Sequence, residues 1–289
     1  MADCLSFELR HLTRRNRDGS HATQAGRLQL LGQCAADLKL LGFRKMGAGS
    51  LKPKHVDALI SKWQGEGLAA GTLKNRLSAL RWWAEKIGKP SLLSKDNATY
   101  GIEARQFVTK DSKAIDLTRQ ALACIADDRI RIALRLQAAF GLRREEALKF
   151  RPMLADQGDY IVLKGSWCKG GRARQVPILT PKQRALLEEA KAVAGRGSLI
   201  PDHLRYVDHL QRYKFLTSSA GISKAHGLRH WYAQWRYQQL TGWAAPASGG
   251  PSRRQLTPVQ REIDRNARMR VSAELGHGRE QVTAVYLGR

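Results

Sequence analysis

A polar segment without periodicity divides this sequence into two parts of different character. Between Pro90 and Lys113 the chain reads PSLLSKDNATYGIEARQFVTKDSK, which shows neither the spacing of a helix nor the alternation of a strand. The part before it has only helical patterns, whereas the part after it also has two strand-like stretches. Because few contacts cross such a segment, we expect two domains, residues 1–92 and 113–289, joined by a linker over residues 93–112.

Three amphipathic helices are expected in the first domain. In chain order, the second of these helices carries Pro53 in its first turn, and the third begins near Thr72 and stops at Gly88. The first helix lies within residues 21–42, where apolar side chains recur every three or four positions and form one stripe. That stripe consists of Leu28, Leu31, Ala35, Leu38 and Leu41.

The third helix presents a polar face, with Lys74, Arg76 and Arg81 along it and Trp82 beside them. Polar helix faces are usually only solvated. In a chain this basic, the same face also suits contacts to the phosphates of a nucleic acid. The sequence leaves both interpretations open.

The second domain is predicted to be mixed α/β, so that the whole chain is mainly α with a small antiparallel sheet. Two strands are expected over residues 160–167 and 174–178, joined by the turn-forming string KGGR. A loop rich in glycine, proline and serine covers residues 242–256. Helices are expected over residues 118–127, 129–140, 181 onward, 203–218, 226–240 and 257–275.

The charge balance indicates a polyanionic partner. Fifty lysines and arginines against 25 acidic residues leave a formal charge of +25 and a pI near 10.5. No apolar run approaches the roughly 20 residues that span a bilayer, and the first residues lack the apolar region of a signal peptide. We therefore expect a cytoplasmic protein that binds a nucleic acid rather than a membrane.

Neither a metal nor a cofactor is expected. The sequence has no CxxC pair, no cysteine with a histidine at ligand spacing and no cluster of carboxylates. The cysteines are expected to be free thiols in a reducing compartment. They are Cys4, Cys34, Cys124 and Cys168.

Four short strings of the second domain carry groups that suit chemistry on a phosphodiester. Each string alone is ordinary, because such pairs and turns occur on many helices and hairpins. Their joint occurrence, in order and in a basic chain, is what favours a common site. The strings are GLRREE from Gly141, KGGR from Lys169 with RQVP from Arg174, HGLRH from His226, and LGH ending at His277, with Tyr286 nine residues further on.

Three of these residues suit the central reaction. A tyrosine oxygen cleaves a phosphodiester without water, because phenolate is also a competent leaving group, and Tyr286 is the candidate. The transition state gathers negative charge on its non-bridging oxygens, which Arg143 and Arg229 can clamp with paired N–H donors.

Other residues suit proton transfer and support. Lys169, on a hairpin turn, can protonate the departing 5′-hydroxyl. His226 and His277 can donate hydrogen bonds to the phosphate or relay the tyrosine proton, since imidazole titrates near neutral pH. Glu146 lies three residues after Arg143 on a helix and is expected to hold a catalytic side chain in place.

The second domain resembles the catalytic domain of the tyrosine recombinases, the family of phage-type integrases and Xer-like resolvases. In that family the first arginine lies in GLR-x-x-E, the hairpin lysine precedes R-x-V-P, the second box reads H-x-L-R-H, and the third reads LGH with a tyrosine nine residues on. The resemblance covers residues 113–289, and the helical domain is more loosely similar to the family's SAM-like core-binding domain. The six catalytic positions match Arg143, Lys169, His226, Arg229, His277 and Tyr286.

The resemblance implies a site-specific DNA recombinase that uses no cofactor. The tyrosine would form a 3′-phosphotyrosyl link and free a 5′-hydroxyl, and a 5′-hydroxyl from another duplex would then attack that link. It also implies a homotetramer on paired sites of double-stranded DNA, accessory DNA-bending or directionality proteins, a nucleoid location, and integration or excision of a mobile element. DNA contacts are predicted for Lys74, Arg76, Arg81, Arg172 and Arg174.

Three other functions fit part of the sequence. A recombinase-derived DNA-binding regulator would keep the charge but would be expected to lose some of the six residues, and none is lost. A type IB topoisomerase shares the chemistry but relaxes supercoils without two specific sites. A basic RNA-associated protein explains the charge but not the ordered strings.

Two features depart from the family pattern. Residues 242–270 insert a loop and a basic segment before His277, which either adds DNA contacts or is simply solvated. Only three residues follow Tyr286, whereas many relatives dock a C-terminal helix on the neighbouring protomer, so the mode of assembly stays open.

Overall fold

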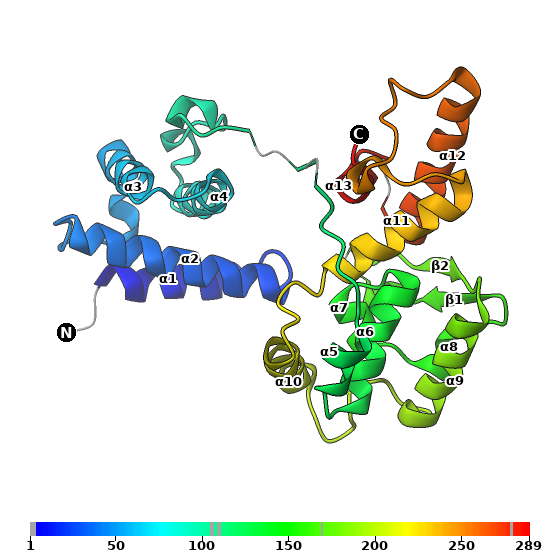
Figure 1. Cartoon of the computed structure of the whole chain (residues 1–289). Helices are drawn as coiled ribbons and strands as arrows, with labels where there is room; N and C mark the ends of the chain where they lie inside the picture. Colours follow the sequence, from blue (N-terminus) through cyan, green and yellow to red (C-terminus); the bar gives the residue numbers. More distant parts are fainter. Residues whose placement is uncertain (1–3, 105–106, 109–110, 169, 278–279) are drawn as a thin grey trace. The chain divides into compact units, whose positions relative to one another are not determined.

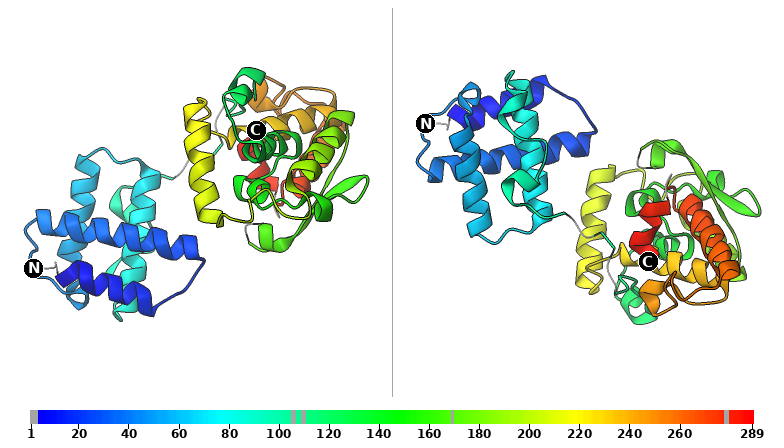
Figure 2. Two further views of the ribbon diagram at one scale, coloured as in Figure 1. Left: turned by 90° about the horizontal axis from the view of Figure 1, so that it is seen from below. Right: turned by 90° about the horizontal axis from the view of Figure 1, so that it is seen from above.

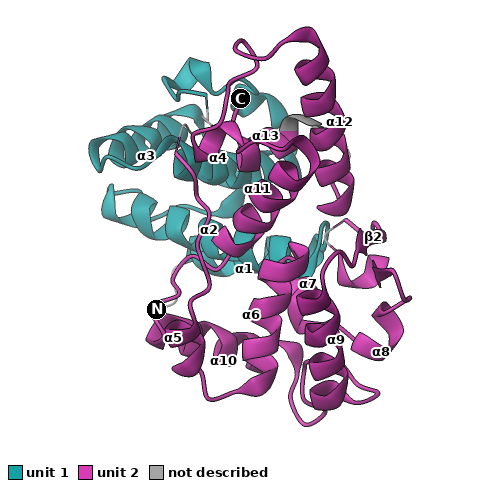
Figure 3. Ribbon diagram, turned by 45° about the vertical axis from the view of Figure 1, so that its right-hand side comes forward, with its two compact units in different colours: residues 1–106 teal, residues 107–289 magenta. Residues whose placement is uncertain are grey.

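The chain forms two compact units, Met1–Gln106 and Phe107–Arg289, which are coloured separately in Figure 3. The computed structural model describes residues 4–104, 107–108, 111–168, 170–277 and 280–289. The boundary between the units falls within the segment expected to be a linker, and each unit has an apolar core of its own. Among the described residues, none of the helices combines the length and the apolar character that a membrane span requires.

Unit 1 is helical (Figure 1). The hydroxyl of Ser20 caps the second helix by accepting the backbone N–H of Thr23, and Pro53 opens the third. Trp63 and Trp83 are fully buried in its core. The main helices are α1 (Cys4–Arg15), α2 (His21–Leu40), α3 (Pro53–Gly65) and α4 (Ala70–Lys86).

Two expectations for this domain need correction. The sequence patterns did not reveal α1, which packs on α2 and buries Leu5 and Leu9. The apolar stripe of α2 is also narrower than predicted, because Leu28 is 36% exposed and Leu41 is 38% exposed. Three-residue steps fall short of a full helical turn, so Leu28 lies at the edge of the stripe, and Leu41 follows the last residue of α2.

Unit 2 is built around two central helices, α6 and α11, which pack on each other. α9 also packs on α6, and α12 and α13 pack on α11; Figure 2 shows the red α13 next to the orange α12. The elements are α5 (Arg119–Ala123), α6 (Asp128–Phe140), α7 (Arg144–Leu148), α8 (Pro152–Ala155), β1 (Tyr160–Leu163), β2 (Arg174–Pro177), α9 (Pro181–Ala194), α10 (Tyr206–Ser219), α11 (Gly227–Thr241), α12 (Pro258–Glu274) and α13 (Glu280–Leu287).

The prediction of a mainly helical fold with a small antiparallel sheet is confirmed. β1 pairs antiparallel with β2, with Leu163 opposite Arg174. The first strand was expected to reach Trp167, but residues 165–167 form a short 3-10 turn instead. At Gly165 a Cβ atom would lie 2.4 Å from the carbonyl oxygen of Gly171, so the hairpin closes there against the backbone.

Candidate active site

Five of the six residues predicted to be catalytic come together in unit 2. The sixth, Lys169, lies outside the described residues. The five stand at the ends of helices or on the last of them. Their places are the residue before α7 (Arg143), the residue before α11 (His226), the first turn of α11 (Arg229), the turn after α12 (His277) and α13 itself (Tyr286).

Arg229 lies at the centre of this cluster and is fully buried. Its two terminal nitrogens donate to the backbone carbonyls of Gly141 and Leu275. Its Nε donates to the Tyr286 hydroxyl at 3.3 Å, and its Nη2 lies 3.2 Å from His277 Nε2. Burial lowers the pKa of Arg229 to about 10, so its guanidinium is still charged at neutral pH. The cluster therefore holds a fixed positive charge beside the tyrosine oxygen.

The hydroxyl of Tyr286 lies between an arginine and a histidine. Besides the contact with Arg229, its oxygen is 3.3 Å from His226 Nε2. The tyrosine ring packs against His230 and His277, with ring centroids 4.4 Å and 5.3 Å apart, and the whole residue is only 6% exposed. These ring contacts hold the tyrosine oxygen within reach of both Arg229 and His226.

The histidines around the tyrosine are held in their neutral form. Burial, assisted by Arg229 and Arg143, lowers the pKa of His277 to about 3. Burial and the nearby His226 lower the pKa of His230 to about 4, and burial lowers the pKa of His226 as well. A neutral imidazole can accept a proton, so His226 is able to take the one that Tyr286 must release.

Glu146 connects Arg143 to a second arginine. Arg143 donates to Glu146 through its backbone N–H and its Nη1, both at 2.7 Å, while Arg174 donates through Nη1 at 2.8 Å and Nη2 at 2.6 Å. Burial alone would raise the pKa of Glu146, but the hydrogen bonds and charge of Arg174, with those of Arg143, lower it to about 2. The expectation that Glu146 supports a catalytic side chain thus has a geometric basis.

Arg174, which was predicted to contact DNA, is engaged within unit 2 in this structure. Its side chain is buried in the hydrogen bonds to Glu146, and its Nε donates to the backbone carbonyl of Glu274 at 2.9 Å. These bonds turn the guanidinium inward, since strand β2 places it on the buried face of the hairpin. Arg172, two residues earlier on the turn, is exposed instead.

His230, the last residue of the HGLRH string, was given no role from the sequence and is a member of the cluster. It follows His226 by four residues, so both lie on one face of the start of α11, and that spacing was the available signal. The spacing could not show which side chain from elsewhere in the chain packs against His230. That partner is Tyr286, which comes from the last helix of the unit.

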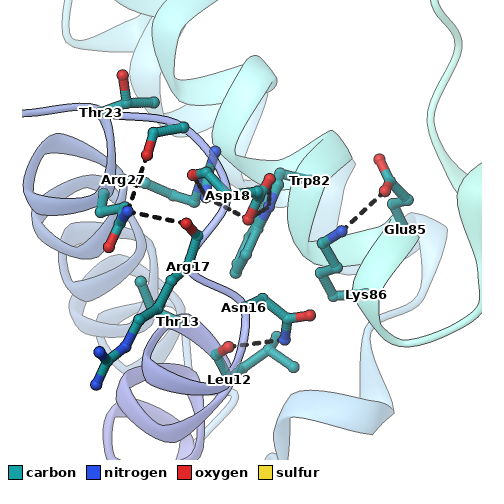
Figure 4. Close-up of polar contacts among 12 residues, drawn as sticks. Leu12, Thr13, Asn16, Arg17, Asp18, Thr23, Arg27, Trp82, Glu85 and Lys86 are labelled. Carbon is teal, nitrogen blue, oxygen red and sulfur yellow. Dashed lines mark hydrogen bonds and ion pairs between the residues drawn. The ribbon is translucent and has the colours of Figure 1, made fainter. Parts of the chain in front are cut away.

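The polar face of α4 is partly closed by unit 1 itself. Trp82 is buried: its indole N–H donates to Asp18 at 3.0 Å and Arg27 stacks over its ring at 4.3 Å (Figure 4). The sequence had placed this tryptophan beside an open face, but the turn between α1 and α2 covers it. Arg76 likewise lies over Trp63, with its guanidinium 4.8 Å from the ring.

Arg81 is also engaged within unit 1. Its Nε donates to the carbonyl of Ser94 at 2.8 Å, and its Nη2 donates to Asn97 at 3.0 Å. Arg81 therefore holds the segment after α4 in place. Lys74, on the same helix, is half-buried.

The inserted segment 242–270 consists of a loop and most of α12. Five of its six arginines are exposed, as DNA contacts or solvation both require. Arg268 differs, because it is buried, bonds Asp264 at 2.7 Å and donates to the carbonyl of Gly288 at 2.9 Å. The insertion is thus in part a support for the end of α13.

Two family models match the chain. The phage integrase N-terminal model matches residues 2–92 and the integrase model matches residues 103–235. The second match ends before His277 and Tyr286, so the grouping of these two with the rest of the site comes from the geometry. No curated protein matches the chain.

Solved recombinase structures share the fold. The chain is similar to XerH site-specific recombinase bound to a palindromic difH substrate (18% identity, TM-score 0.60, 99% of this chain and 82% of that one). It is also similar to a lambda integrase dimer bound to a core site (15%, 0.63, 99% and 96%) and to the Tn1549 transposon integrase in complex with transposon right end DNA (13%, 0.56, 98% and 94%). At such identities the likeness shows the fold.

Proposed function

This chain belongs to the tyrosine recombinase family and is a site-specific DNA recombinase, and from this premise we propose that Tyr286 is the nucleophile that joins it to DNA. The observation that carries the proposal is the position of the Tyr286 oxygen, 3.3 Å from both Arg229 Nε and His226 Nε2. A regulator without catalysis would have no need of this arrangement, and neither it nor a topoisomerase is favoured.

The proposed cleavage step uses each group once. The Tyr286 oxygen bonds to the scissile phosphorus while His226 takes its proton, and the bond from phosphorus to the 5′-oxygen breaks. Arg143 and Arg229 bind the non-bridging oxygens as charge builds on them, with His277 beside Arg229. Lys169 is proposed to protonate the leaving 5′-oxygen. The second step reverses these roles with a 5′-hydroxyl from another duplex, so bond energy is conserved.

The DNA-bound state is proposed by analogy and charge. A net charge of +25 favours wrapping of double-stranded DNA by both units, with Lys74 and the exposed Arg172 as phosphate contacts. Arg76 and Arg81 contribute there only by shaping the face around them, given their bonds within unit 1. Lambda integrase has been solved as a tetramer bound to a Holliday junction, and we propose a homotetramer on paired sites here too.

The biological setting is also proposed. Relatives of the same fold include a phage-type and a transposon integrase, which favours integration or excision of a mobile element. That setting implies accessory DNA-bending or directionality proteins and a nucleoid location in the cytoplasm.

The test is covalent trapping on DNA that carries the recombination site and a nick beside the scissile phosphate. Loss of the short nicked strand prevents religation, so a protein–DNA adduct accumulates and is seen by denaturing electrophoresis. Tyr286→Phe is expected to abolish the adduct while DNA binding persists, because only the attacking oxygen is removed. An adduct of normal yield from the Phe variant would show that another residue attacks.

A further inference from the structure

Gln234 bonds three segments that are far apart in the sequence. It lies on α11 and is 8% exposed. Its Nε2 donates to the backbone carbonyl of Tyr286 at 2.9 Å. Its Oε1 accepts from the hydroxyl of Ser112 at 2.9 Å and from that of Ser248 at 2.7 Å. One amide therefore joins the segment that leads into unit 2, the inserted loop and the nucleophile.

The backbone that follows Tyr286 is held by further contacts. Arg268 donates to the Gly288 carbonyl, and a Cβ atom on Gly288 would lie 2.7 Å from the backbone nitrogen of Ala247. Ala247 belongs to a short 3-10 turn of the inserted loop that also provides Ser248. Arg268 and the inserted loop thus hold the backbone at the end of α13, and these contacts do not depend on the tyrosine side chain.

These contacts matter because α13 is too short to fix its own position. It has eight residues, and an isolated helix of that length is not stable in water. The carbonyls of a last helical turn have no partner within the helix, so outside donors decide where that turn lies. A displacement of about 1 Å at a reacting atom costs on the order of 100-fold in rate.

We propose that Gln234 is a positioning residue for the nucleophile, fixing Tyr286 through its backbone carbonyl and tying it through Ser112 to the segment that joins the two units. Gln234 touches no reacting atom, and its action passes through the placement of the Tyr286 oxygen. The inference rests on the proposed role of Tyr286.

The variants separate donation to Tyr286 from packing. Gln234→Met keeps the length of the side chain and removes all three hydrogen bonds. Gln234→Glu still accepts from both serines but presents a carboxylate to the Tyr286 carbonyl. Gln238→Met makes the same change four residues further along α11 at an exposed position and is the matched control.

The measurements are the single-turnover rate of adduct formation at saturating protein, the affinity for site DNA, and the thermal unfolding midpoint. Both Gln234 variants are expected to form the adduct at least about tenfold more slowly with unchanged affinity, and Gln238→Met is expected to match the wild type. Ser112→Ala is expected to slow the adduct as well. Wild-type rates for Gln234→Glu or for Ser112→Ala would overturn the proposal.

A pH profile distinguishes positioning from a merely structural role. When the carboxyl of Gln234→Glu is protonated it can again donate to the Tyr286 carbonyl, and burial raises the pH at which this happens. The rate of this variant relative to the wild type is therefore expected to rise as pH falls, within one folded protein. A ratio independent of pH would overturn the proposal. Failure of the proposed function would look different, because the adduct would then survive Tyr286→Phe.

Discussion

Neutralising Glu146 is expected to weaken both the fold and the reaction. Its carboxylate is 1% exposed and accepts four hydrogen bonds from Arg143 and Arg174. The pKa of Glu146 is lowered from 4.5 to about 2, and each unit corresponds to about 1.4 kcal/mol of free energy. Glu146→Gln should therefore lower the free energy of unfolding by about 3 kcal/mol at pH 7.

The pH dependence of this difference follows from the direction of the shift. Because the folded protein holds Glu146 at a lower pKa than the unfolded chain, the stabilisation is complete above pH 4.5 and is lost as pH falls toward 2. The gap between wild type and Glu146→Gln should shrink from about 3 kcal/mol at pH 7 to ~1.4 kcal/mol at pH 3. Urea unfolding at several pH values measures it.

Glu145→Gln is the matched control for this variant. Glu145 is adjacent, is half exposed and pairs with Lys149 on the surface, so its loss should cost less than about 0.5 kcal/mol at any pH. The adduct should form roughly 100-fold more slowly in Glu146→Gln, because Arg143 loses the group that aims it. Equal unfolding midpoints for Glu146→Gln and Glu145→Gln would refute the reasoning.

Two further expectations follow from the arginines and the turn before them. Arg143→Ala should slow adduct formation by about 1000-fold yet lower the free energy of unfolding by under about 1 kcal/mol, because Glu146 keeps its bonds to Arg174. Arg229→Ala should slow the reaction as well and also lower the free energy of unfolding by roughly 3–5 kcal/mol, because two buried carbonyls lose their donor. Equal destabilisation of the two variants would contradict this. Gly141→Ala should lower the free energy of unfolding by about 2–4 kcal/mol, since the φ of Gly141 is +62° and a Cβ atom there would lie 2.5 Å from Tyr232. Gly158→Ala, at φ +85° with open space around it, is the control for the backbone cost alone. Similar unfolding midpoints for the two variants would show that the Tyr232 ring moves aside.

Most helices were predictable because each leaves a local signal. Thr257 and Pro258 mark the start of α12, and the side chain of Thr257 indeed caps it by accepting a backbone N–H. The apolar spacing of α6 and α11 is equally local. By contrast α13 is short, and the position of its tyrosine depends on contacts with α11 and the inserted loop. Nothing within eight residues can encode those contacts.

The site was predictable as a set of residue types and not as a geometry. The sequence offered Arg143 and Arg174 as two more basic side chains, one for the phosphate and one for DNA. Only the fold shows that both share Glu146, because strand pairing turns Arg174 inward, whereas Arg172 lies exposed on the turn before the strand. Alternation along the strand predicts that Arg174 and Val176 share one face and that Gln175 lies on the other, but which face is inward depends on the core that it meets.

In the proposed reaction, the charges of the site favour the transition state over the free phosphodiester. The side chains whose charges act on His277 are Arg143, Arg174 and Arg229, which are positive, and Glu146, which is negative; Lys113 adds a positive charge near His230. The histidines add none, because burial keeps them neutral, and Glu274 is balanced by Arg236. A phosphodiester brings a single negative charge, whereas attack by the tyrosine oxygen brings more charge onto the phosphoryl oxygens. A fixed excess of positive charge in a site of low dielectric is then balanced only as the reaction proceeds, so it lowers the barrier rather than merely tightening binding. Glu146 sets that excess, because without its charge Arg174 would be an unpaired cation in the core.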